Sequence, residues 1–251
     1  MSIFNRHPQD HVGKWFEQRR KLGVSDTIYW AKYKPESNDL KVHEFQHANG
    51  DGMSIMRHML NNAGHFDTEI PVCKEKAPPT RSQLKTIKRK LKPYSKTTKW
   101  LYKQEDAQSK YQQNQKAKAN PTHNSLNTLF FSRQQTQAIE DRARSLNVPV
   151  TTLILWSLNR AAASKLLQAD QEYSWFYPVN LRGAVDYGTP FSNYSSGFYL
   201  PVTGDISIHE MHQRIREKLK SGEHWHTWQQ AKISKWLPGF AIRWLYQYIS
   251  N

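Results

Sequence analysis

Two short stretches near the N-terminus alternate between apolar and polar residues, a pattern typical of strands that bury one face. They are Thr27–Lys34 and Leu40–Gln46, and the polar segment Pro35–Asp39 separates them. A short segment of proline and small polar residues suits the turn of a β-hairpin. We therefore expect the two strands to pair with each other.

A helix is predicted soon after this hairpin. Four apolar residues recur there at helical spacing, namely Ile55, Met56, Met59 and Leu60. The loop Ala48–Gly52 precedes them and holds two glycines that can take positive φ, so Gly52 would let the chain turn sharply after Asp51. His47, Asp51 and Gly52 therefore lie where a strand leads into a helix, and side chains at such a place can be held rigidly beside a cleft.

The rest of the chain predicts further helices and strands. Asp10 suits the cap of a helix that runs to about Leu22, where Gly23 ends it. Two later helix starts carry the capping-box pattern, Ser132 with Gln135 and Ser207 with Glu210. The other predicted elements are the strands 127–131, 173–179 and 194–202 and an apolar core helix that Thr151 or Thr152 opens.

Composition favours a globular protein with a sizeable core, because 37% of the 251 residues are hydrophobic and 23% are charged. Cys73 is the single cysteine, which excludes a disulfide within the chain and suits a reducing compartment. The first residues hold no apolar secretory signal, and no apolar run reaches the length of a membrane span. These features predict a cytoplasmic protein, with peripheral contact to a membrane left open.

Positive charge is concentrated in one segment. The chain carries a formal net charge of +15, and residues 74–118 hold 14 Lys and Arg against three acidic residues. Prolines at 78, 79 and 93 interrupt this segment. We therefore expect a basic linker over residues 74–120, between an N-terminal half (1–73) and a C-terminal half (121–251).

Three interpretations of the basic linker stay open. It can be a solvated charged face, a contact with an anionic membrane surface or anionic substrate, or a nucleic-acid contact. Nucleic acid is the least supported, although Trp100 and Tyr102 lie nearby. Leu84, Ile87 and Leu91 predict a short basic amphipathic helix within the linker. The cations expected to meet a membrane are Lys85, Lys88, Arg89, Lys90 and Lys92.

The residue types at the strand-to-helix connection suggest acid–base chemistry. A neutral imidazole such as that of His47 is the commonest general base near neutral pH, and a nearby carboxylate such as Asp51 can pair with an arginine. A hydrogen-bonded loop histidine is the simpler interpretation of His47. His43 with His47 and Asp51 also suggests a metal site, but residues four apart on a strand lie about 13 Å apart, so no metal is predicted.

Two motifs resemble a known enzyme superfamily. Gln46–Ser54, QHANGDGMS, resembles the HHxxxDG signature of acyltransferases that share the chloramphenicol acetyltransferase fold. These include peptide-synthetase condensation domains, wax ester synthases and alcohol acyltransferases. Gln46 departs from the first histidine of the signature. Downstream, YPVNLR (177–182) and NYSSGFYLPV (193–202) resemble a conserved C-terminal region of the same superfamily.

The resemblance implies a fold and a set of roles. The fold class would be α/β, an α+β sandwich in the two-half chloramphenicol acetyltransferase-like architecture. His47 would be the catalytic general base, while Asp51 would be structural and pair with Arg182, for which a surface position is the simpler alternative. Ser195, Ser196 or Asn193 would stabilise the oxyanion, although both serines can equally be small polar residues on a strand. No bound cofactor is implied, because the acyl-CoA or acyl-carrier thioester is a co-substrate.

The resemblance does not cover the whole of that fold. Only 46 residues precede His47 and the chain stops at Asn251, so we expect an architecture that is incomplete at both ends. A partner chain or a homo-oligomer stays open for the same reason. The predicted function is transfer of an acyl group from a thioester to an alcohol or amine. The alternative is a non-catalytic or truncated homologue that binds a membrane or acidic partner through the basic linker.

Overall fold

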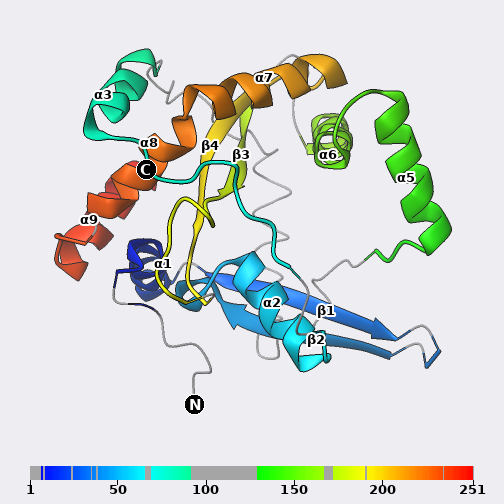
Figure 1. Ribbon diagram of the computed structural model, residues 1–251, viewed down its shortest axis with the longest axis horizontal. Coiled ribbons are helices and arrows are strands. Elements are labelled where there is room, and N and C mark those ends of the chain that lie inside the picture. Colours follow the sequence, from blue (N-terminus) through cyan, green and yellow to red (C-terminus); the bar gives the residue numbers. More distant parts are fainter. Residues whose placement is uncertain are drawn as a thin grey trace. The chain divides into compact units, whose positions relative to one another are not determined.

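The computed structural model describes residues 7, 9–23, 25–34, 36–37, 39–65, 69–91, 129–166, 172–189, 191–233 and 235–250. Helices and strands both contribute, so the chain belongs to the α+β class, in agreement with the coarser part of the predicted fold. Figure 1 shows the elements in chain order: α1 (His11–Lys21), β1 (Thr27–Lys34), β2 (Asp39–Gln46), η1 (His47–Asn49), α2 (Gly52–Asn62), α3 (Arg81–Lys90), α5 (Arg133–Ser145), α6 (Val150–Leu166), β3 (Tyr173–Asn180), β4 (Ser195–Val202), α7 (Ile208–Ser221), α8 (Glu223–Ile233) and α9 (Gly239–Ser250).

The predicted hairpin and N-terminal helix are confirmed. Strands β1 and β2 pair antiparallel, with Thr27 opposite Gln46 and Lys34 opposite Asp39. Helix α1 begins after Asp10, whose side chain accepts a hydrogen bond from the Gly13 N–H. Gly23 follows the helix with a φ of +78°, a conformation that favours glycine and ends the helix where the sequence predicts.

The chain forms two compact units whose boundaries differ from the predicted halves. Unit 1 comprises residues 1–91, 178–198 and 222–251, and unit 2 comprises residues 92–177 and 199–221. Segments of the expected C-terminal half therefore group with the N-terminal residues, because their apolar side chains share one core. The division falls within β3 and β4, which form a second two-stranded sheet.

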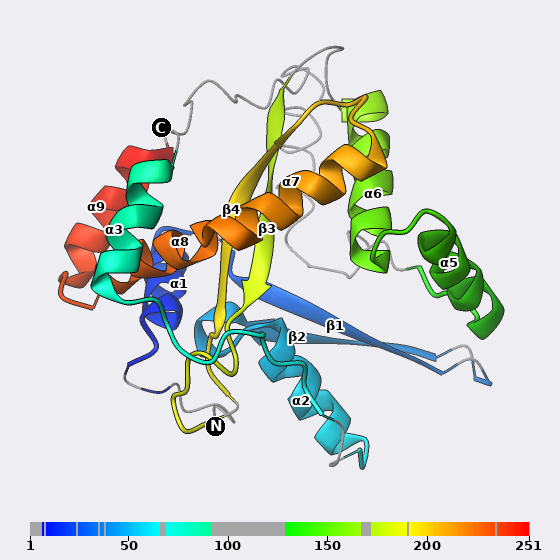
Figure 2. The same ribbon diagram turned by 45° about the horizontal axis from the view of Figure 1, so that its top comes forward.

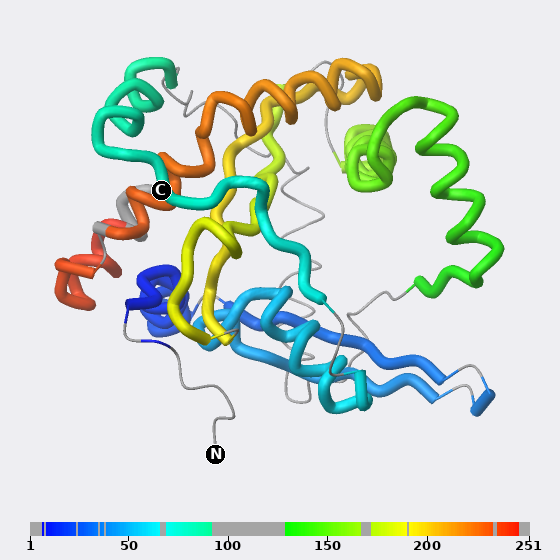
Figure 3. Tube along the Cα trace, viewed as in Figure 1, coloured from blue at the N-terminus to red at the C-terminus, as the bar shows by residue number. Residues whose placement is uncertain are grey.

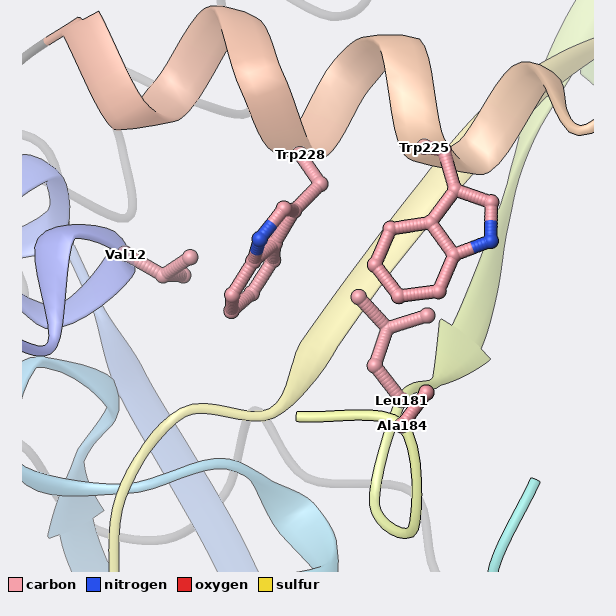
Figure 4. Close-up of a cluster of buried hydrophobic side chains, with 5 residues drawn as sticks. All are labelled: Val12, Leu181, Ala184, Trp225 and Trp228. Carbon is pink, nitrogen blue, oxygen red and sulfur yellow. The ribbon is translucent and has the colours of Figure 1, made fainter. Parts of the chain in front are cut away.

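The core of unit 1 joins segments that are far apart in the sequence. Val12 of α1, Leu181 and Ala184 after β3, and Trp225 and Trp228 of α8 form one buried cluster (Figure 4). Both indoles are almost fully buried, at 3% and 4% exposure. Burying an aromatic side chain contributes several kcal/mol, so this cluster fixes α1 and α8 around the segment that follows β3.

A buried histidine extends this core. The His11 ring packs edge-on against Trp228, with 4.3 Å between ring centroids, and its Nε2 lies 3.2 Å from the Trp228 carbonyl oxygen. Burial lowers the pKa of His11 to about 4, although the backbone hydrogen bond acts in the opposite direction. His11 is therefore a neutral core residue at neutral pH.

Unit 2 is organised around a buried polar side chain. Asn159 of α6 is fully buried, and its Oδ1 accepts hydrogen bonds from the Tyr173 hydroxyl at 2.6 Å and from Trp175 Nε1 at 2.8 Å. Its Nδ2 donates to the Thr203 carbonyl at 3.0 Å. These bonds satisfy the donor and acceptor groups of the buried amide. They also join α6 to residues at the ends of β3 and β4.

Two sequence predictions in unit 2 are wrong. A strand was predicted over residues 127–131, but residues 129–131 form no strand, and 127 and 128 lie outside the described residues. Leu129 is 77% exposed and leads into the capping box of α5. Helix α6 was expected to be a core helix, but Ile154 and Leu158 are about half exposed. An apolar pattern shows which residues favour burial, but not which helix faces other elements cover.

Part of the predicted basic linker is helical. Residues 81–90 form α3, whose start carries a complete capping box between Thr80 and Gln83, and Leu84 and Ile87 pack against the unit 1 core. The short basic amphipathic helix is thus confirmed. Lys92, Trp100 and Tyr102 lie outside the described residues. Among the described helices, none is both long enough and apolar enough to cross a membrane.

Candidate active site

His47 lies in η1, the single helical turn that connects β2 to α2 in unit 1. Its backbone N–H donates to the Asp26 carbonyl oxygen at 2.7 Å, and the Ala48 N–H donates to Asp26 Oδ2 at 3.1 Å. The imidazole stacks on Phe16 of α1, with 3.8 Å between ring centroids and 17° between the planes. Backbone and ring are therefore both held in place, while the side chain keeps partial exposure.

The turn after His47 does not use its glycines as expected. Gly50 has a φ of 173°, which is extended backbone, and Gly52 is the first residue of α2. Neither glycine therefore uses the positive φ that this residue type allows. The chain turns because Asp51 adopts an extended conformation and caps α2 by accepting a hydrogen bond from the Ser54 N–H at 2.9 Å.

Asp51 forms the expected ion pair with Arg182. The two guanidinium nitrogens lie 2.9 Å and 2.7 Å from the two carboxylate oxygens, a bidentate arrangement. Asp51 is 3% exposed and Arg182 is 8% exposed, so a surface position for Arg182 is wrong. The Tyr194 N–H also donates to Asp51, at 2.8 Å. With all these partners, the carboxylate is committed to holding the loop.

Several groups keep Arg182 in this buried position. Its guanidinium also donates to Ser54 Oγ at 2.7 Å and lies 4.4 Å from the ring centroid of Tyr194. The Cys73 N–H donates to the Arg182 carbonyl at 2.7 Å, so the segment before α3 runs beside the loop that follows β3 (Figure 3). The next residue, Gly183, has a φ of +98°, and a Cβ there would lie 3.3 Å from the Cys73 carbonyl oxygen.

Tyr194 contributes a neutral phenol to this cluster. Its hydroxyl donates to the Thr189 carbonyl and accepts from the Tyr187 N–H. Burial is the largest influence on its ionisation and raises the pKa of Tyr194 above the usual value, although Arg182 acts in the opposite direction. The residue is therefore a hydrogen-bonding and stacking partner for the ion pair and cannot act as a base near neutral pH.

Asn193 connects the His47 ring to a buried carboxylate. Its Oδ1 lies 2.8 Å from His47 Nδ1, and its Nδ2 lies 3.0 Å from Asp10 Oδ2. The Asn193 backbone N–H donates to the same Asp10 oxygen at 2.9 Å. Asp10 is 1% exposed and Asn193 is fully buried, so the link between these two side chains is shielded from water.

The order of donors and acceptors follows from the carboxylate. Asp10 accepts hydrogen bonds at both oxygens, Oδ1 from the Gly13 N–H at 2.7 Å and Oδ2 from Asn193. An ionised carboxylate has no proton to donate, so its partners must be donors. The Asn193 amide must then turn its NH₂ towards Asp10 and its oxygen towards His47. An oxygen acceptor places the proton of His47 on Nδ1, and the lone pair of the neutral ring lies on Nε2.

This geometry corrects the role expected of Asn193. The side chain was a candidate oxyanion donor, but its amide is engaged by Asp10 on one side and by His47 on the other. No local pattern in the sequence indicates Asp10, Asp26 or Phe16 as neighbours of the His47 loop. Asp10 carries a signal for a helix cap only, and nothing in the local sequence indicates a partner 183 residues away.

The two candidate serines occupy different environments. Ser196 is 8% exposed, and its hydroxyl donates to the His224 carbonyl at 2.6 Å. Ser195 is only partly buried and is the first residue of β4. The Leu181 N–H donates to the Tyr194 carbonyl oxygen, so the β3–β4 pairing extends to the residue before Ser195. Alternate residues of an extended chain share a face. Ser195, two residues after Asn193, is therefore the serine that we expect on the same face.

Separate alanine substitutions should distinguish the serines. For the acyl-transfer chemistry that the resemblance implies, we expect Ser195→Ala to lower the turnover number for thioester cleavage by about 10²-fold, the effect of losing one oxyanion donor. Ser196→Ala removes a buried hydrogen bond and should cost about 1 kcal/mol of stability with little change in turnover. Steady-state kinetics and urea unfolding of both variants check this expectation; equal turnover losses would contradict the assignment.

His43 does not share an element with His47. This residue lies opposite Trp30 in the hairpin, whereas His47 belongs to η1. Within the described part of the chain, no three or more His, Cys, Asp or Glu side chains gather as metal ligands would.

Comparisons with models of known protein families, with curated proteins and with solved structures found no match for this chain.

Proposed function

We propose that the protein transfers an acyl group from a CoA or carrier-protein thioester to an alcohol or amine, with His47 as the general base. One observation carries the proposal: Asn193, itself oriented by buried Asp10, accepts a hydrogen bond at His47 Nδ1. This arrangement leaves Nε2 as the basic nitrogen. Within the described part of the chain, no hydrogen bond to Nε2 is present. A neutral, oriented imidazole is what general-base catalysis requires.

Each step can be assigned to groups of this chain. His47 Nε2 would take the proton of the acceptor hydroxyl or amine while its oxygen or nitrogen attacks the thioester carbonyl carbon. The carbonyl oxygen becomes an oxyanion, for which Ser195 is the proposed donor. Collapse of the intermediate breaks the carbon–sulfur bond, and the imidazolium returns its proton to the leaving thiolate. The imidazolium would keep its Nδ1 hydrogen bond to Asn193 throughout.

The finer architecture is part of the same proposal. A chloramphenicol acetyltransferase-like arrangement is supported by the position of His47 between a strand and a helix, and by the Asp51–Arg182 pair. In that family the aspartate of the signature is structural, as the contacts of Asp51 would make it here. The net charge of +15 would favour a donor that carries phosphates.

Thioester turnover tests the proposal directly. Purified protein is incubated with acyl-CoA thioesters of increasing chain length, with and without alcohol and amine acceptors, and the released thiol and the acylated product are measured. Parent activity that is lost on replacing His47 supports the proposal. The alternative, a non-catalytic binding module, predicts no thiol release from any donor and no effect of His47 on binding.

We predict that Asp10 and Asn193 set the tautomer of His47. In Asn193→Ala the imidazole loses its acceptor and can place its proton on Nε2, so turnover should fall about 10- to 100-fold with little change in KM. In Asp10→Asn the Asn193 amide can rotate by 180° and present its NH₂ to His47, which favours the wrong tautomer. ¹⁵N NMR of the His47 ring should report this change in both variants.

Asp26→Asn is the matched control for these variants. Asp26 is also a buried carboxylate at the same loop, and it accepts from the Ala48 N–H, but it does not contact Asn193. An asparagine at this position keeps the acceptor oxygen. The control should therefore retain the parent tautomer and turnover. If Asp10→Asn leaves the ¹⁵N shifts of His47 unchanged, the proposed orientation of the imidazole is wrong.

A further inference from the structure

Three large aromatic side chains lie exposed around the C-terminal helix of unit 1. Trp236 precedes α9 and is 85% exposed, while Phe240 and Trp244 within the helix are 68% and 65% exposed. Residues four apart lie on the same face of a helix, so Phe240 and Trp244 form one aromatic stripe, and Trp236 precedes it at the same spacing. We name Trp236, Phe240 and Trp244 the aromatic face of α9. Exposure of three such side chains together is unusual for a surface that meets only water.

Contacts on the other side of α9 fix the direction of this face. Ile242, two residues from both Phe240 and Trp244, is 1% exposed, and α9 packs against α1. Arg243 donates to Gln18 Oε1 of α1 at 2.8 Å. Lys14 of α1 donates to the carbonyl oxygens of Lys235 and Leu237, in the turn that leads into α9. The helix is thus docked through its Ile242 side, and the aromatic face points away from α1.

A strongly basic helix lies at the same end of unit 1. Helix α3 contains Arg81, Lys85, Lys88, Arg89 and Lys90, all exposed, and it contains no acidic residue. Its Leu84 and Ile87 pack against the core, and it contacts α8. Figures 1 and 2 place both α3 and α9 at the end of unit 1 opposite the tip of the β1–β2 hairpin. Aromatic and cationic groups are therefore concentrated at one end of this unit.

We propose that this end of unit 1, the aromatic face of α9 together with the cations of α3, docks onto an anionic lipid bilayer. Tryptophan and phenylalanine side chains insert at the boundary between headgroups and acyl chains, and lysine and arginine attract lipid phosphates. Charge complementarity selects this occupant. The proposal is independent of the acyl-transfer chemistry, because neither α3 nor α9 contributes to the hydrogen-bonded site around His47.

Two other occupants fit the surface less well. A second copy of this chain would bring two α3 helices and two chains of net charge +15 together, which opposes association. Single-stranded nucleic acid is bound by aromatic residues interleaved with free cations along one groove. Arg243, the basic residue of α9 itself, is engaged with Gln18, and although Lys232 and Lys235 precede Trp236, the five exposed cations of α3 lie on a separate helix. Separate aromatic and basic zones are the arrangement of an interfacial membrane site.

Vesicle flotation tests the aromatic face. The parent protein should float with phosphatidylcholine vesicles that contain about 30% phosphatidylserine, and much less with phosphatidylcholine alone. We expect Phe240→Gln/Trp244→Gln to weaken this binding about tenfold or more. The matched control is Ile154→Gln/Leu158→Gln, which removes two exposed apolar residues at the same spacing from α6 and should bind as the parent does.

A second pair of variants tests the charges. Lys85→Gln/Lys88→Gln/Lys90→Gln should weaken binding roughly 100-fold at low salt, about fivefold for each charge, and added salt should weaken the parent in the same way. The control, Lys32→Gln/Lys34→Gln/Lys41→Gln, removes the same number of exposed cations from the hairpin, so both variants have the same net charge. This control should bind nearly as well as the parent.

Several outcomes would overturn the proposal. Equal losses in the α3 and hairpin variants would show that only net charge matters, and equal losses in the α9 and α6 variants would show nonspecific stickiness. If light scattering shows a dimer for the parent and a monomer for Phe240→Gln/Trp244→Gln, the aromatic face binds a second copy of the chain. Tighter binding to single-stranded nucleic acid than to anionic vesicles, lost in the same α9 variant, would assign it to nucleic acid.

Discussion

Replacing His47 by alanine should lower the turnover number for thioester cleavage by about 10²–10⁴-fold, the usual contribution of a positioned general base. His47→Gln should have the same effect, because a glutamine amide can still donate to Asn193 but cannot accept a proton. The prediction depends on the hydrogen bond that holds Nδ1 and leaves Nε2 basic. Thiol release under saturating donor and acceptor measures it.

His43→Ala is the matched control for this prediction. His43 lies four residues earlier, on an exposed position of β2, and it contributes no contact to the hydrogen-bonded site. The control should keep the parent turnover. Circular dichroism of each variant shows whether the fold survives loss of the stacking contact between His47 and Phe16. Full activity in a folded His47→Gln variant would remove His47 from the mechanism.

The sequence could predict local structure where one element carries its own signals. Asp10 and Gly23 mark both ends of α1, and the alternation on both sides of Pro35–Asp39 predicts the hairpin. Such signals act within a few residues, through capping, turn conformation and side-chain alternation. They do not show which helix faces other elements cover, which is why the exposure of Ile154 and Leu158 on α6 was not foreseen.

The candidate site was predictable only where a motif supplied the long-range contact. The pair between Asp51 and Arg182 joins residues 131 positions apart, and it was expected from the resemblance rather than from any local pattern. The link from Asp10 through Asn193 to His47 had no such guide. A carboxylate has two oxygens, and the capping signal accounts for only one of them. The second partner depends on tertiary packing.

Arg182→Met should destabilise unit 1 by about 3–5 kcal/mol, because it leaves the Asp51 carboxylate buried without its counter-ion. Methionine fills most of the volume of the arginine stem, so the loss of charge dominates the effect. Two atoms of Asp51 would each lose a charge-assisted bond, and Ser54 would lose one as well. Urea unfolding of the variant and of the parent measures the change.

A double-mutant cycle separates the ion pair from simple loss of packing. Asp51→Asn keeps an oxygen to cap α2 but leaves Arg182 without a counter-ion, so it should also destabilise the unit. Each single variant leaves one buried charge without its counter-ion, whereas the double variant leaves none. The double variant Asp51→Asn/Arg182→Met should therefore cost less stability than the two single changes added together. Strictly additive costs would show that the two side chains do not act as a pair.

Lys21→Met is the matched control, since it breaks an ion pair of the same unit that lies at the surface. Lys21 lies 3.1 Å from Glu17 on α1, and its side chain is 52% exposed. Exposed pairs of this kind contribute about 0.2–1 kcal/mol, because water and salt screen both charges. The control should therefore unfold within about 1 kcal/mol of the parent. If Arg182→Met also lowers the free energy of unfolding by no more than about 1 kcal/mol, the Asp51 carboxylate finds other partners. The loop that carries His47 would then not depend on the Asp51–Arg182 pair.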